Sequence, residues 1–220
     1  MAIAFSASGN TITAASGTTV VSPSIAVGVG DLVVVCGGDA VGGTAPSISD
    51  SLGQSWTALT GPTTNGRRLA KWYSVITVGG SMTVTLTYDS STVRRAVIVA
   101  AFTGLGASPL DANPANVSDN TFPYDCPSTG TLAQLDELVI GFAVVQAGTS
   151  LSATSPDTLL ENPRAAGLTV AMSYRIVSGT SAVSPQFTGP SDSGVVGTAS
   201  FKGGSAVLIP RRVDPVYLRM

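Results

Sequence analysis

Few of the residue types that carry enzyme chemistry occur in this chain. It contains no histidine, which excludes Ser-His-Asp and Cys-His catalysis, histidine acid–base chemistry and histidine-bound zinc. Its two cysteines cannot supply a four-thiolate zinc site. Gly28-Val29-Gly30 and Gly37-Gly38 flank an apolar strand, but neither leads into the helix or the Lys-Ser/Thr pair of a phosphate-binding loop. We interpret these glycines as turn residues and expect no cofactor.

The thirteen acidic residues show no catalytic or metal-binding spacing. A glycosidase needs two carboxyl groups that face each other across a cleft. The aspartates that could serve lie in predicted turns, where aspartate usually caps backbone amides: Asp50, Asp89, Asp125 and Asp192. No Asp-x-Asp-x-Asp spacing indicates a calcium loop. We therefore predict no enzymatic activity, no catalytic residue and no metal site.

Three aromatic residues belong to the most distinctive local pattern. Residues 50–56 are Asp-Ser-Leu-Gly-Gln-Ser-Trp, in which Asp50 is expected to cap a turn and Gly53 to take a positive φ before Trp56 enters a strand. Trp72 and Tyr73 follow in a second strand. The three rings suit a stacking platform for sugars, and they equally suit a plug at the end of a hydrophobic core, the commoner place for tryptophan. The sequence leaves both interpretations open.

The cysteines and the first residues bear on the cellular compartment. Cys36 ends an apolar strand and is interpreted as a small buried hydrophobe, whereas Cys126 lies in a predicted loop. A disulfide between them is neither required nor excluded. Residues 1–6 lack the basic and apolar regions of a secretion signal, and the longest apolar run, Ala96–Phe102, is too short to cross a bilayer. We expect synthesis and folding in the cytoplasm, without a membrane partner.

Charged residues make up only 11% of the chain, and the net charge is −2. Arg67-Arg68 and Arg94-Arg95 are interpreted as isolated pairs at strand ends, so no basic surface for nucleic acid is expected. A soluble monomer usually keeps a charged surface of mixed sign. A surface of Ser, Thr, Gly and Ala favours a protein that packs against neighbours, and we expect a homo-oligomer.

The two halves of the chain repeat one another. Short apolar segments recur in the same order about 100 residues later: Leu32 matches Leu138, Tyr73 matches Tyr174 and Phe102 matches Phe201. The offsets are 106, 101 and 99 residues, so small deletions in turns account for the drift. A period this long suits a duplicated half-domain. We place the pseudo-repeats at about 30–104 and 137–203.

The composition and the turn signals predict an all-β protein. The expected strands are Ala2–Ser6, Thr18–Val21, Leu32–Cys36, Trp56–Leu59, Ala70–Ile76, Met82–Tyr88, Val93–Phe102, Leu138–Val145, Asp157–Leu160, Leu168–Val177, Ala182–Phe187 and Val195–Phe201. Each half thus carries about five strands after the first two, and a proline-rich loop, 104–131, joins the halves. Two small barrels are one arrangement. We favour one jelly-roll-like sandwich over residues 1–204, because a shared core buries more surface.

Residues 205–220 differ in composition from the repeats. Pro210 and Pro215 forbid a regular helix or a central strand. The segment is either a frayed end or an extended C-terminal arm that packs on another subunit. A disordered tail seldom holds so many large apolar residues, so we favour the arm. Its expected contact residues are Leu208, Ile209, Arg211, Arg212, Tyr217 and Leu218.

Asp50-x-x-Gly53-x-x-Trp56, the Leu69–Tyr73 run and Ala101-Phe102-Thr103-Gly104 resemble β-sandwich modules of bacteriophage virion proteins and bacterial surface proteins. The resemblance covers residues 30–104, with a fainter echo over 137–203. It implies a jelly-roll-like fold and a minor tail or capsid-decorating role in a tailed phage. The implied partners are other virion proteins, and the implied location is the virion. The alternative function is a carbohydrate-binding or receptor-binding module that takes a host-surface glycan.

Overall fold

The computed structural model describes residues 1–13, 17–40, 44–60, 67–89, 94–146, 148–165 and 167–204. These residues form β-strands and turns without any helix, so the all-β prediction is confirmed. Each predicted strand overlaps an observed one. The expected arm residues, Leu208, Ile209, Arg211, Arg212, Tyr217 and Leu218, lie outside the described residues.

The first half of the chain forms strands β1 to β10. They are β1 (Ala4–Thr13), β2 (Thr19–Val21), β3 (Ile25–Val27), β4 (Leu32–Asp39), β5 (Ser47–Asp50), β6 (Thr57–Ala58), β7 (Arg68–Val75), β8 (Gly80–Met82), β9 (Val84–Thr87) and β10 (Arg95–Thr103). The large sheet of this half has the order β1-β10-β4-β7-β6. Two small sheets, β2-β9-β5 and β3-β8, cover its outer face.

The second half forms strands β11 to β20. They are β11 (Leu105–Ala112), β12 (Val117–Asp119), β13 (Tyr124–Asp125), β14 (Asp136–Val145), β15 (Ser152–Ala153), β16 (Thr158–Glu161), β17 (Arg164–Ala165), β18 (Leu168–Ser178), β19 (Gln186–Thr188) and β20 (Gly194–Gly203). Its large sheet has the order β11-β20-β14-β18-β16, to which β12 and β17 add at the edges. A small sheet, β13-β19-β15, covers the outer face.

The two large sheets have the same strand order, and the matched residues occupy the same register. Leu32 pairs with Phe102 in the first half, and Leu138 pairs with Phe201 in the second. Likewise Tyr73 lies opposite Val34, and Tyr174 lies opposite Ile140. The sequence repeat therefore corresponds to a repeated sheet, because residues of equal spacing meet equivalent neighbours.

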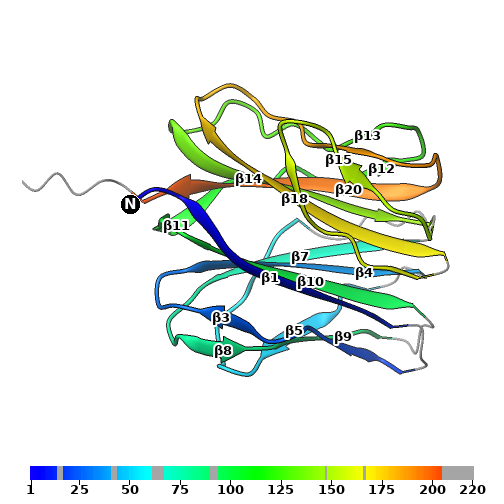
Figure 1. Cartoon of the computed structure of the whole chain (residues 1–220), viewed down its shortest axis with the longest axis horizontal. Helices are drawn as coiled ribbons and strands as arrows, with labels where there is room; N and C mark the ends of the chain where they lie inside the picture. Colours follow the sequence, from blue (N-terminus) through cyan, green and yellow to red (C-terminus); the bar gives the residue numbers. More distant parts are fainter. Residues whose placement is uncertain are drawn as a thin grey trace, which may run out of the picture.

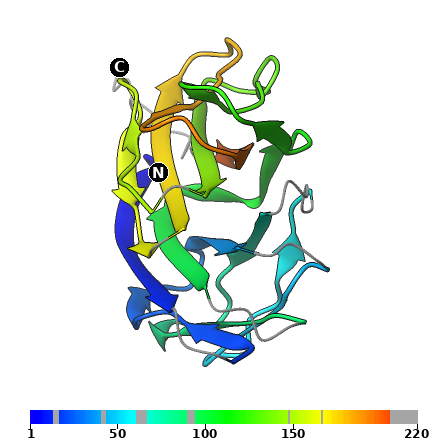
Figure 2. The same ribbon diagram turned by 90° about the vertical axis from the view of Figure 1, so that its right-hand side faces the viewer.

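The four layers stack as small sheet, large sheet, large sheet, small sheet (Figures 1 and 2). The core between the large sheets contains residues of both halves, such as Phe102 and Phe142. Each half also has an outer core beneath its small sheet. Along β4, Leu32 and Val34 face the central core while Val33 and Val35 face the outer one. Burial on both faces explains why this strand is a continuous apolar run.

Two sequence interpretations are wrong. Residues 104–131 are not one long loop, because β11, β12 and β13 lie within them. Pro109 and the register shifts of β11 against β20 hide the strand pattern, as expected for an edge strand. Gly37-Gly38 are not turn residues either, since both lie in β4. A Cβ on Gly38 would lie 2.5 Å from Val170 Cγ2, so the glycine permits close approach of the two large sheets.

Candidate functional site

The Asp50–Trp56 turn forms as expected. Asp50 accepts hydrogen bonds from the Leu52 and Gln54 amides at 2.7 and 2.9 Å and from Trp56 Nε1 at 2.8 Å. Gly53 has a φ of +71°. Trp56 is half-buried and packs on the outer core of the first half. The motif thus fixes the indole ring on the turn instead of presenting it freely to solvent.

The structure does not gather the three candidate aromatic residues on one surface. Trp72 and Tyr73 are consecutive in β7, so their side chains point to opposite faces of the sheet. Trp72 is 5% exposed and lies in the outer core of the first half. Tyr73 faces the other large sheet and makes an edge contact with Phe201, with ring centroids 5.4 Å apart. Only Trp56 and Tyr73 keep partly exposed rings.

Tyr73 lines a groove between the halves, which we call the seam groove. Its walls come from the β6–β7 edge of the first large sheet and from β11 of the second, and its volume is about 280 Å³. Ser55, Thr57 and Ser108 supply hydroxyl groups, while Leu110 supplies an apolar wall. The groove suits a small neutral ligand that offers both hydroxyl groups and an apolar face.

The equivalent seam on the opposite side of the molecule is closed. There Phe5 stacks on Tyr174, with ring centroids 5.8 Å apart. Glu161 also accepts hydrogen bonds from Ser8 and Asn10 across the seam, at 2.6 Å and 2.5 Å. Phe5 pairs with Phe102 as Leu110 pairs with Phe201. The smaller Leu110 therefore stands where the other seam has a phenyl ring, which leaves the seam groove open.

The arginine pairs of the sequence are not isolated from each other. Asp39 of β4 lies between Arg68 of β7 and Arg95 of β10, and all three side chains are buried. Arg68 forms ion pairs with Asp39 at 2.7 Å and with Asp89 at 3.1 Å. Hydrogen bonds from Thr44, together with Arg68, lower the pKa of Asp89 to about 2. Arg68 thus binds two carboxylates of the same chain and Arg95 donates a hydrogen bond to the Gly17 carbonyl oxygen, which argues against a phosphate site.

Lys71 is buried between the large sheets. Its Nζ lies 3.5 Å from Asn113 Oδ1, 3.4 Å from the Thr198 carbonyl oxygen and 5.4 Å from the centre of the Phe142 ring. Burial lowers its pKa to about 8. Ala70 and Trp72, on either side of this lysine, face the outer core of the first half. Side chains alternate along a strand, so the sequence pattern alone is equally consistent with a Lys71 that faces solvent.

The two cysteines are both free and buried, and the sequence left their pairing open. Burial raises the pKa of each thiol to about 12, so neither is a thiolate at neutral pH.

Two carboxyl groups come together that the sequence did not connect. Glu137 is fully buried, and its pKa is raised. Burial is the larger cause, and the charge of the nearby Asp111 carboxyl adds to it. Its Oε1 accepts a hydrogen bond from the Gln134 amide at 3.0 Å. The pair lines none of the described cavities, unlike the facing carboxyl groups of a glycosidase.

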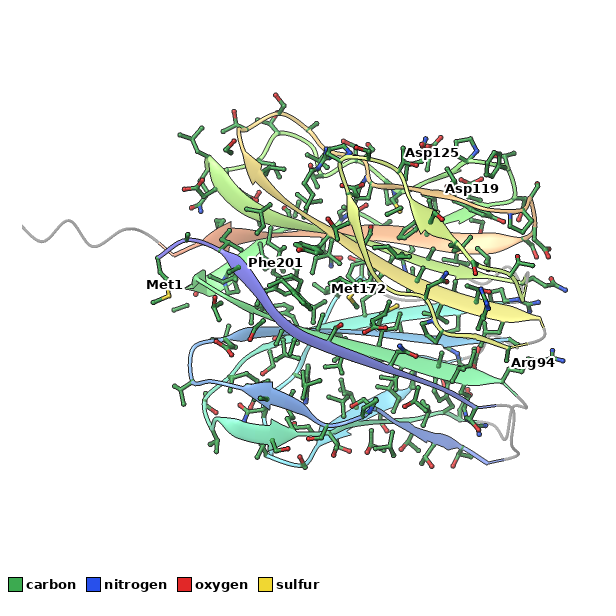
Figure 3. The ribbon with its side chains drawn as sticks, in the orientation of Figure 1. Met1, Arg94, Asp119, Asp125, Met172 and Phe201 are labelled. Carbon is green, nitrogen blue, oxygen red and sulfur yellow. The ribbon has the colours of Figure 1, made fainter. Side chains whose placement is uncertain are left out.

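Several large apolar side chains are exposed at the end of the molecule that holds Met1, which Figure 3 labels. We call it the end face and define it by Met1, Val29, Val78, Leu135 and Ile176, which are 42 to 86% exposed. β20 finishes at this end, and Gly204 donates a hydrogen bond to the Gly104 carbonyl there. Arg94 lies at the opposite end of the molecule (Figure 3).

Among the residues that the structure describes, no three Cys, Asp or Glu side chains are placed to hold a metal ion. The same residues contain no helix long and apolar enough to cross a membrane. Comparison with protein-family models, with curated proteins and with solved structures finds no match for this chain.

Proposed function

We propose that this chain is a non-enzymatic structural protein of a tailed-phage virion, either a minor tail or a capsid-decorating protein, that assembles through protein–protein contacts. The end face is the observation that carries the proposal. Five large apolar side chains are exposed there beside the point where residues 205–220 begin. Exposed apolar surface grouped at one place favours a contact with another protein.

The distribution of charge supports the same proposal. Eight basic residues lie in the described part of the chain, and four of them, Arg67, Arg68, Lys71 and Arg95, are buried. Charged side chains are few in the sequence, and burial of these four leaves even fewer on the surface. A surface with few charges favours packing against neighbours. The two large sheets, one from each half, face each other across a shared core, which supports the expectation of one jelly-roll-like sandwich built from the two halves.

Particle incorporation tests the proposal. The full chain and a chain lacking residues 205–220 would each carry an affinity tag and be expressed in cells that produce the phage. We expect the full chain to co-purify with particles and the shortened chain to remain soluble and unbound. Absence of the full chain from particles contradicts the virion role, and equal incorporation of the shortened chain contradicts the arm.

A carbohydrate-binding function is the second candidate, and the seam groove favours it. Tyr73 offers an aromatic ring, and the surrounding hydroxyl groups offer hydrogen bonds to a neutral sugar. A glycan array with the wild type, Tyr73→Ala and Trp56→Ala tests it. Tyr174→Ala is the matched control, because Tyr174 occupies the equivalent place in the closed seam. Binding that Tyr73→Ala abolishes and Tyr174→Ala retains supports a sugar site; no binding by the wild type contradicts it.

A further inference from the structure

The end face contains a groove of about 650 Å³. Met1, Val29 and Leu105 provide its apolar walls, and Asp31 provides a carboxylate. Gly204 also lines the groove and is the last residue that the structure describes. Residues 205–220 therefore begin at the wall of an apolar groove.

The sequence after Gly204 is complementary to the end face. Val207-Leu208-Ile209 is a short apolar run, and Arg211-Arg212 follows it directly after Pro210. On the end face, the exposed apolar side chains lie beside Asp31 and Asp136. Apolar groups thus match apolar groups, and two positive charges match two negative ones. Pro210, between the two parts, disfavours a helix in this sequence.

The direction of β20 decides which groove the segment reaches. The strand runs toward the end face and finishes at Gly203, so Gly204 lies at this end of the molecule (Figure 1). Val207 follows only a few residues later, and a residue spans about 3.3–3.6 Å of extended chain. A segment that continued the direction of β20 would move away from its own molecule, whereas binding in its own groove would need a change of direction. The groove of a second molecule that faces the end requires no reversal.

We propose that residues 207–212 of a second copy of the chain bind in the end-face groove, with Val207–Ile209 against Met1, Val29 and Leu105 and with Arg211-Arg212 beside Asp31 and Asp136. This inference rests on the proposed assembly function and names the partner of the segment. The groove and the root of the segment lie at the same end of the molecule. Two copies that meet end to end therefore exchange segments reciprocally, which closes a two-fold dimer instead of building a filament.

Disulfide trapping in the full chain tests the exchange. The double variant Val29→Cys, Leu208→Cys would be oxidised mildly and separated on a non-reducing gel, with intact mass measured. The native Cys36 and Cys126 are buried, so they contribute little background. Val21→Cys, Leu208→Cys is the matched control, because Val21 is 46% exposed but lies on the outer small sheet. We expect a cross-linked dimer from the first variant and at least tenfold less from the control.

Each other outcome overturns the proposal. A cross-link within one chain would show that the segment folds back on its own groove, and a ladder of higher species would exclude a closed dimer. Equal dimer from the control would indicate random collision, and no cross-link would remove the groove as the site. Sedimentation provides a second measurement: we expect a dimer for the wild type and a monomer for Leu208→Asp, and a monomeric wild type contradicts the dimer. Particle incorporation is scored separately, so failure of the dimer and failure of the virion role are distinguishable.

Discussion

A buried lysine whose polar contacts are neutral oxygen atoms is costly, and Lys71 is such a lysine. It is 1% exposed, and its polar contacts are long, at 3.4 and 3.5 Å. We predict that Lys71→Met raises the free energy of unfolding at pH 7 by about 1–3 kcal/mol, because methionine fills similar space without a charge to desolvate. Urea unfolding measures the change.

The pH dependence separates this charge effect from a packing effect. The folded pKa of Lys71 is about 8 and its ordinary value is 10.5, so the unfolded chain binds the extra proton between these values. Wild-type stability therefore gains from this residue as pH rises through that window. The advantage of Lys71→Met should shrink accordingly, whereas Lys202→Met, at a half-exposed position, should show little effect. An advantage that is constant with pH contradicts the charge argument.

The contribution of Glu137 to stability changes with pH in the opposite direction. Its folded pKa is raised above the ordinary 4.5, so the folded chain holds the proton more tightly than the unfolded chain. Its contribution to stability is complete below pH 4.5 and is lost as pH rises through the folded pKa. We predict that the stability of Glu137→Gln falls less than that of the wild type between pH 4.5 and 7. Thermal unfolding across this range measures it, and parallel curves for the two proteins would refute it.

At the scale of elements, the contact of the two large sheets depends on small residues. Gly38 faces Val170 and Val144 of the other half, and a Cβ would lie within 2.9 Å of both. We predict that Gly38→Val destabilises the fold by about 2 kcal/mol or more, because the sheets must separate to admit the side chain. Gly179→Val is the control, since no atom lies within 4 Å of its Cβ position. Denaturant midpoints of the two variants provide the comparison, and equal midpoints would contradict the close approach.

The central strands of the large sheets could be predicted from sequence because each buries a long run of side chains. Leu32–Cys36 and Leu138–Val145 are apolar on both faces, and the repeat fixed their correspondence. Some of the short strands of the small sheets were missed for the opposite reason. β3 and β15 contain two or three residues each, too few to show a period. β11 was missed because Pro109 and its bulges interrupt the alternation.

The candidate sites were less predictable, because they depend on contacts between the halves. The seam groove follows from Leu110 standing where Phe5 stands in the other seam, and no local pattern reveals that relation. The sequence did predict the Asp50 cap, because an Asp before a glycine turn is a local signal. The sequence did not show that Trp72 packs in the outer core while Tyr73 faces the other large sheet, because that depends on how the sheets pack together.

At the scale of the whole molecule, two similar halves share a central core while each keeps an outer core. The outer cores alone are small, since each lies between a large sheet and a few short strands. Separation of the halves would expose the inner faces of both large sheets, including Phe102 and Phe201. Because apolar exposure on that scale is unfavourable, we expect neither half to remain folded without the other.

The positions of the tryptophans allow this coupling to be measured. Both tryptophans, Trp56 and Trp72, lie in the first half, so their fluorescence reports on that half, while circular dichroism reports on both. Phe187 lies in the outer core of the second half and is fully buried. We predict that Phe187→Ala lowers stability by about 3–5 kcal/mol and shifts both signals together. Leu86→Ala, in the outer core of the first half, should also shift both. An unchanged fluorescence midpoint in Phe187→Ala would mean that the halves unfold as separate domains.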